Sequence, residues 1–117
     1  MAGALAPANA CHCSRCRKAF SGAGSAMTFV APGTFRWVAG EAGVRDYVSE
    51  AGWGLGFCQR CGSTLVATHG GAVVGITLGT LDGDPEVEIG QHLFVGSKAG
   101  WDQIGGSAPQ FEERPPA

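Results

Sequence analysis

The alternation of apolar and polar positions along the chain predicts a protein built from short strands. Apolar and β-branched residues gather in short runs, and most runs end at Gly, Pro or Asp, which is typical of strands joined by tight turns. The strongest run, AVVGITLGTL at 72–81, has the length and composition of a buried strand. The pattern contains no long amphipathic helix, so it predicts a mainly β fold.

Turn residues divide these runs into an expected order of elements. Residues 26–31 and 34–39 flank a Pro-Gly pair and are expected to form a hairpin. The segment SRCRKAFSG at 14–22 is expected to form a short helix that ends at Gly22. Further strands are expected at 44–49, 54–57, 63–68, 72–81 and 86–95, with a final turn or short helix within 97–106.

Length and composition fit one small domain. A chain of 117 residues buries roughly 65% of its unfolded surface, which is enough for a single core. Its 20 glycines exceed the usual share of about 7% and support many tight turns. We therefore expect a single domain over residues 1–117, with a loose lead-in at 1–10 and an irregular, proline-rich tail at 112–117.

The charge balance excludes some classes of partner. The sequence has 8 Lys+Arg against 10 Asp+Glu and a pI of about 5.8, without the basic excess of nucleic-acid or membrane-surface binders. No apolar run approaches the roughly 20 residues of a membrane span. The first ten residues, MAGALAPANA, lack the basic leading segment of a secretion signal. We expect a soluble, cytoplasmic protein with no nucleic-acid or membrane partner.

Five cysteines in two clusters carry the candidate chemistry. An odd number of cysteines in a chain of cytoplasmic character disfavours a disulfide framework and favours metal ligation. In FCQRCGS, Cys58 and Cys61 have the spacing of two thiolates on one zinc ion, and Gly62 allows the tight turn between them. A redox pair with this spacing is expected at a helix N-terminus rather than between strands, so we interpret the pair as a metal knuckle.

The first cluster, ACHCSRCRKAF at 10–20, brings Cys11, Cys13 and Cys16 into six positions. Three protein ligands with an open fourth position are typical of catalytic zinc, whereas structural zinc takes four ligands. Two arrangements stay open. Either the first cluster binds its own ion and the C-x-x-C pair a second, or one ion is shared, with Cys11 as a bystander, by Cys13, Cys16, Cys58 and Cys61. The sequence therefore predicts one or two Zn²⁺ per chain.

Charged and aromatic residues around the cysteines are candidates for substrate contacts. Arg15, Arg17 and Lys18 form either a solvated helix face or a clamp for the carboxylates of an anionic thiol such as glutathione. His12 is expected to be an exposed spacer rather than a base, and His92 either supports its strand or faces the zinc pocket. His69 is expected to be solvated in a turn, and core or pocket-wall positions are expected for Trp37, Trp53 and Trp101.

Four segments of the chain resemble a known family. The motifs CHCSRCRK, FCQRCGSTL and GITLGTLD, with the ending QHLFVGSKAGWDQIGGSAPQF, are similar to the glutathione-dependent formaldehyde-activating enzyme and centromere protein V family. The resemblance implies a β-tent fold of several short coiled antiparallel sheets, here with a short helix after the first cysteine cluster. It implies a catalytic zinc on Cys11, Cys13 and Cys16, and a structural zinc on Cys58, Cys61 and a C-x-C carried by an N-terminal strand.

The sequence departs from the family pattern at its start. Ten residues precede Cys11 and none is a cysteine, so this sequence lacks the N-terminal C-x-C strand. Either the start is trimmed or misassigned, or the metal is rearranged into a single site.

The resemblance implies a zinc-dependent carbon–sulfur lyase-type enzyme, similar to S-hydroxymethylglutathione synthase. Its substrates would be adducts of glutathione, or a similar thiol, with formaldehyde or a small aldehyde. One alternative is a non-catalytic binding module in which zinc only stabilises a small fold and every cysteine is structural. Another is a thiol-redox or persulfide-handling protein. The oligomeric state is left open, with a homodimer as one option.

Overall fold

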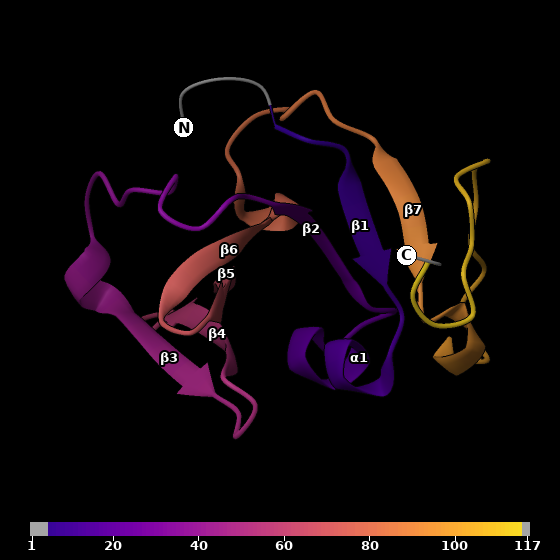
Figure 1. Cartoon of the computed structure of the whole chain (residues 1–117), viewed down its shortest axis with the longest axis horizontal. Helices are drawn as coiled ribbons and strands as arrows, with labels where there is room; N and C mark the ends of the chain where they lie inside the picture. Colours follow the sequence, from indigo (N-terminus) through magenta and orange to yellow (C-terminus); the bar gives the residue numbers. More distant parts are fainter. Residues whose placement is uncertain (1–4, 116–117) are drawn as a thin grey trace. The chain divides into compact units, whose positions relative to one another are not determined.

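The structure is a computed structural model that describes residues 5–115 of the chain. These residues form seven strands, one α-helix and three 3-10 turns. Figure 1 shows the strands and the helix along the chain. The described residues fall into two compact units. The mainly β class and the short helix after the first cysteine cluster are confirmed. Among the described residues, no helix has the length and apolar composition of a membrane span.

The first unit comprises residues 5–6 and Thr28–Pro85 and is an antiparallel meander. Glycines in the second of its strands let the neighbouring strands come close, since a Cβ at Gly54 would lie 2.6 Å from the carbonyl oxygen of Tyr47. Val66 and Ile76 face each other in the core of this unit. Its strands, in spatial order, are β3 (Val44–Val48), β4 (Trp53–Cys58), β5 (Thr64–His69) and β6 (Ala72–Thr77).

The second unit comprises Pro7–Met27 and residues 86–115. Its central strand is β1 (Ala8–Cys11), which pairs with the start of β2 (Ser25–Phe29) on one edge and with β7 (Ile89–Leu93) on the other. The helix α1 (Ser14–Phe20) fills the connection between β1 and β2. The pairing of β1 with β7 is parallel, whereas β1–β2, β3–β4, β4–β5 and β5–β6 are antiparallel, so the strands are mixed in direction.

The strand β1 starts inside the segment expected to be a loose lead-in. That prediction is wrong for residues 8–10, because Ala8 and Ala10 are buried and both edges of the strand are paired. Small side chains give this strand too little hydrophobic signal to be recognised from the sequence. Residues 1–4 of the lead-in and 116–117 of the tail lie outside the described residues, while residues 112–115 of the tail have no helix or strand.

The hairpin predicted around the Pro-Gly turn does not form. Residues 26–31 supply β2, but residues 34–39 contain no strand. The alternation that suggested a strand there comes from a local aromatic pair, since the rings of Phe35 and Trp37 meet edge to face at 4.9 Å. Val38 is 87% exposed, so this segment has no sheet face to bury.

Other predicted elements are confirmed with shorter bounds. The apolar run at 72–81 forms β6 and then a 3-10 turn, Leu78–Thr80. The run at 86–95 contributes β7, and the turn expected within 97–106 lies at residues 100–101. A 3-10 segment, Val95–Ser97, precedes it. The helix α1 ends at Phe20, and Ser21, at φ 54°, adopts the left-handed conformation expected of Gly22.

Candidate metal centre

The first cysteine cluster lies where β1 passes into α1. Cys11 ends the strand, Cys13 caps the helix, and Cys16 lies in its first turn. The three Sγ atoms lie within 4.8 Å of one another, and each cysteine is partly buried. The backbone N–H of Cys16 donates to the Sγ of Cys13 at 3.4 Å, as a capping side chain requires. The local fold therefore gathers all three thiols at one place.

A close backbone approach fixes the position of Cys11. Cys11 pairs with Ser25 of β2, and Gly24 lies directly against the carbonyl group of Cys11. A Cβ on Gly24 would lie 2.2 Å from that carbonyl oxygen, far inside van der Waals contact. The return of the chain from α1 to β2 therefore depends on a residue without a side chain.

The pKa values of Cys11 and Cys16 are shifted in opposite directions. A hydrogen bond from the Cys11 thiol lowers the pKa of Cys16 to about 6, against the opposing effect of burial, with further lowering from Ser25, Cys13 and Arg15. The same hydrogen bond, together with burial, raises the pKa of Cys11. In the metal-free protein, Cys16 therefore carries the thiolate near neutral pH and Cys11 stays protonated.

Alkylation of metal-free protein should report this asymmetry. We expect Cys16 to react with iodoacetamide ahead of Cys11, with a rate that falls as the pH drops through about 6. Because the folded pKa of Cys16 lies below its unfolded value of 9.0, its contribution to stability is full above pH 9 and is lost as the pH falls toward 6. Peptide mass spectrometry at a series of pH values measures both rates. A free cysteine derivative is the control, and equal rates at Cys11 and Cys16 would contradict the assignment.

The cluster fits one zinc ion. Sulfur atoms on a tetrahedral zinc are roughly 3.5–4 Å apart, and three atoms already within 4.8 Å need only a small contraction. Thiolates are the soft ligands that zinc favours. Since each cysteine is only partly buried, a fourth ligand could reach the ion from solvent. Cys11, Cys13 and Cys16 can therefore hold a metal with one position open.

The second cysteine pair lies at a tight turn between β4 and β5, and its role as a metal knuckle stays a prediction. Cys58 ends β4, β5 begins at Thr64, and the intervening turn is closed by a hydrogen bond of 2.7 Å from the N–H of Gly62 to the carbonyl of Cys58. Gly62 has φ 83°, as its place after the second cysteine predicts. The Ser63 hydroxyl lies 3.1 Å from the exposed Cys61 sulfur and lowers the pKa of that thiol. The shared four-cysteine site combines residues of the two units and stays a prediction.

The basic residues of α1 differ in exposure. Arg15 and Lys18 are exposed, and the charge of Arg15 is one of the causes that lower the pKa of Cys16. Arg17 is half-buried, and its Nε is buried with no hydrogen-bond partner among the described residues. Two of the three cations are therefore exposed to solutes, and the carboxylate clamp stays a prediction.

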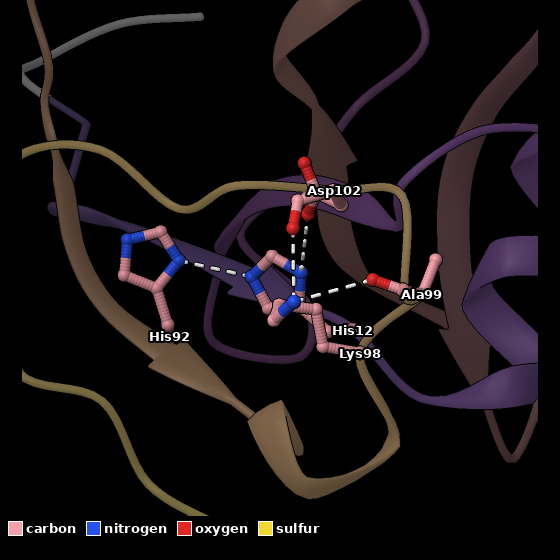
Figure 2. Close-up of polar contacts among 5 residues, drawn as sticks. All are labelled: His12, His92, Lys98, Ala99 and Asp102. Carbon is pink, nitrogen blue, oxygen red and sulfur yellow. Dashed lines mark hydrogen bonds and ion pairs between the residues drawn. The ribbon is translucent and has the colours of Figure 1, made fainter.

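The prediction that His12 is an exposed spacer is wrong. Its side chain is buried, and its Nε2 lies 3.0 Å from Nδ1 of His92, 80 positions along the chain (Figure 2). The reason is that strand pairing continues past Cys11, since the N–H of His12 donates to the carbonyl of Leu93 at 2.9 Å. Burial and then the charge of His12 lower the pKa of His92, while Asp102 raises it.

Sequence reasoning missed two residues of this network. Nδ1 of His12 lies 3.7 Å from a carboxylate oxygen of Asp102. The ammonium group of Lys98 donates to the carbonyls of Ala99 and Asp102 at 3.2 and 2.9 Å (Figure 2). No spacing in the segment SKAGWD signals this role. For His12, one signal was available in the sequence. It lies between two cysteines on an extended segment, where alternation directs its side chain to the side opposite the two cysteine side chains.

The remaining candidates lie outside the cluster. His69 is exposed, as predicted, but it is the last residue of β5 rather than a turn residue, and its ring centroid lies 4.2 Å from that of Trp53. Trp53 and Trp101 are 46% and 72% exposed, so the expectation of core positions is wrong for both. Trp37 is half-buried against Phe35.

Comparison with known proteins agrees with the cysteine pattern. No curated protein matches the chain at a significant level. The model of the family described as glutathione-dependent formaldehyde-activating enzyme matches residues 2–97, a span that contains both cysteine clusters and every strand of the structure. Because this match covers most of the 117 residues, the chain belongs to the glutathione-dependent formaldehyde-activating enzyme family.

Proposed function

We propose that the protein is a zinc-dependent carbon–sulfur lyase-type enzyme that acts on adducts of glutathione, or a similar thiol, with formaldehyde or another small aldehyde. The observation that carries this proposal is the cluster of three thiols within 4.8 Å in a member of this family. A cytoplasmic location fits the proposal, because glutathione keeps thiols reduced in that compartment.

The reaction requires no oxidant or reductant. The thiol sulfur adds to the carbonyl carbon, a carbon–sulfur bond forms, and the proton lost from sulfur ends on the former carbonyl oxygen. The reverse reaction breaks the same bond and regenerates thiol and aldehyde. When bound to Cys11, Cys13 and Cys16, zinc would supply Lewis acidity and favour the thiolate form of a substrate thiol.

The chain's own residues would bind and orient the thiol substrate. Arg15 and Lys18 are exposed on α1 and offer charge to the carboxylates of glutathione, with Arg17 as a half-buried third cation. His92 also belongs to the proposed substrate site. Its Nδ1 is engaged by His12, so only its Nε2 is available to a substrate.

The proposal is tested by measuring adduct formation directly. Zinc-loaded protein should accelerate the interconversion of glutathione, formaldehyde and S-hydroxymethylglutathione, measured by exchange NMR against the spontaneous rate. Calorimetry with glutathione alone gives the binding step separately. Zinc-loaded protein that leaves the exchange rate unchanged and binds no glutathione rules out the proposal.

Removing the exposed cations should weaken glutathione binding. We expect the Kd for glutathione to rise about fivefold for Arg15→Gln and again for Lys18→Gln, since an exposed ion pair contributes up to about 1 kcal/mol. The effect should shrink at high salt. Arg36→Gln and Arg45→Gln, exposed cations of the other unit, are the matched controls and should leave the Kd unchanged. Equal Kd values in all four variants would contradict the clamp.

A zinc-stapled binding module makes the opposite prediction about the first cluster. If every cysteine is structural, the wild-type protein does not accelerate adduct exchange, and loss of the Cys11 thiol changes only stability. In an enzyme, Cys11→Ser lowers the exchange rate under conditions where far-UV circular dichroism shows that the fold is retained.

A further inference from the structure

We propose that His12 is a positioning residue for the three-thiol cluster. Its buried imidazole, held between His92 and Asp102, fixes the direction in which Cys11 and Cys13 present their sulfurs (Figure 2). The inference rests on the proposed function in one respect, because it takes the three-thiol cluster to be the metal site.

The backbone couples the orientation of His12 to that of its two neighbours. Cys11 is the last residue of β1, and Cys13 has the extended φ and ψ of −67° and 159°. In extended backbone, successive side chains point to opposite sides. His12 is therefore directed away from the side on which Cys11 and Cys13 lie. A rotation of the backbone that moved His12 out of its place would swing both sulfurs.

His92 is a fixed partner for His12. Through the pairing of β1 with β7, His92 lies opposite Ala10. On the other edge of β7, the N–H of His92 donates to the carbonyl of Pro109 at 2.8 Å, and its carbonyl accepts from the N–H of Phe111 at 2.9 Å. The backbone of the histidine that holds His12 is thus anchored by two hydrogen bonds on one edge of β7, while the other edge of the strand pairs with β1.

Asp102 defines the proton arrangement of the pair. Nδ1 of His12 has no hydrogen-bond partner among the described residues and lies 3.7 Å from a carboxylate oxygen of Asp102. We place the ring hydrogen on Nδ1, because a lone pair there would face negative charge. Nε2 of His12 then accepts the hydrogen bond from Nδ1–H of His92. Lys98 holds the backbone of the loop that carries Asp102. All four polar side chains come from the same unit as the cluster.

The test compares substitutions that keep or remove the hydrogen bond. His12→Gln retains an acceptor near the place of Nε2, whereas His12→Leu fills a similar volume without one. We expect His12→Leu to weaken zinc binding at the cluster by about 10- to 100-fold, the usual effect of removing a group that orients metal ligands. The d–d bands of the Co²⁺-substituted protein should change as well. His12→Gln should restore most of the affinity and the wild-type spectrum.

A second pair of variants covers the case in which His12→Leu does not fold. His92→Asn keeps a donor near the place of Nδ1, and His92→Leu removes it, so the same difference in affinity and spectrum is expected between them. His69→Leu, an exposed histidine of the other unit, is the matched control and should bind Co²⁺ as the wild type does. Far-UV circular dichroism of each metal-free variant separates loss of the fold from loss of positioning.

The outcomes separate this inference from the proposed function. Leucine variants that bind Co²⁺ with wild-type affinity and spectrum, or Gln and Asn variants that are as impaired as the leucine variants, overturn the positioning role alone. Wild-type protein that gives no thiolate-to-cobalt charge-transfer band overturns the metal site itself and the proposed function with it. A wild type that binds Co²⁺ but does not accelerate adduct exchange overturns the proposed function and leaves the positioning role supported by the variants.

Discussion

Cys16→Ser is expected to remove tight zinc binding from the first cluster and to reduce adduct formation to the spontaneous rate. Cys16 carries the thiolate of the metal-free cluster, since its pKa of about 6 is the lowered one of the coupled pair. Four-ligand zinc sites contribute about 10–16 kcal/mol, so one ligand accounts for roughly 3 kcal/mol or on the order of 100-fold in affinity. A serine hydroxyl stays protonated at neutral pH and cannot replace a thiolate.

Competition with a chelator measures the zinc affinity of this variant, and exchange NMR measures its activity. Cys61→Ser is the matched control, since it makes the same chemical change at an exposed thiol of the other unit. It should keep an ion at the first cluster and keep the charge-transfer band of the Co²⁺ form. Wild-type zinc affinity in Cys16→Ser would show that the three-thiol cluster is not the tight site.

Gly24→Ala is expected to have the largest effect on stability. A Cβ there would lie 2.2 Å from the carbonyl oxygen and 3.1 Å from the carbonyl carbon of Cys11, and both atoms are backbone that cannot rotate away. Relief of the overlap must separate β1 from β2 at Cys11. We expect a loss of about 3 kcal/mol or more in the free energy of unfolding, or roughly 10–20 °C in Tm.

The displaced backbone belongs to a candidate ligand, so zinc affinity should fall together with stability. Gly22→Ala is the matched control, because it lies two residues away in the same connection and its Cβ would meet its nearest atom at 3.8 Å. It should change the free energy of unfolding by no more than about 0.5 kcal/mol. Thermal unfolding followed by circular dichroism compares the two variants. Equal Tm values for Gly24→Ala and Gly22→Ala would mean that the overlap at Cys11 is relieved without loss of stability, which would contradict the prediction.

Local sequence signals predicted the elements whose partners are close in the chain. The apolar runs that became β4, β5 and β6 are joined by short turns, and each pairs with its neighbour in sequence. The turn that carries Cys58 and Cys61 was predictable for the same reason, since Gly62 and the C-x-x-C spacing act within one turn. The cysteines of the first cluster span only six positions, and α1 brings them together without distant residues.

The parts that sequence reasoning missed depend on distant partners. The alternation at 34–39 resembles that of a strand, but β2 pairs with β1, and beyond it the N–H of Val30 donates to the carbonyl of Val74 in β6. Nothing near His12 in sequence shows that it contacts His92, which lies 80 positions away along the chain. Because β1 consists mostly of small residues, no hydrophobicity pattern identifies it as a strand. Its pairing on both edges nevertheless makes it the central strand of its unit.

The parallel pairing of β1 with β7 sets the order in which the site can be made during synthesis. Ribosomes add roughly 5–20 residues per second, so the 80 positions between His12 and His92 correspond to roughly 4–16 s. During the later part of that interval, once residues 11–16 have left the ribosome, the three clustered thiols are exposed before β7 exists. The thiols then meet the reductants and metal ions of their surroundings without the strand and the histidine that later hold them. The cluster is therefore made before the strand that orders it, and it reaches its final geometry only after β7 has been synthesised.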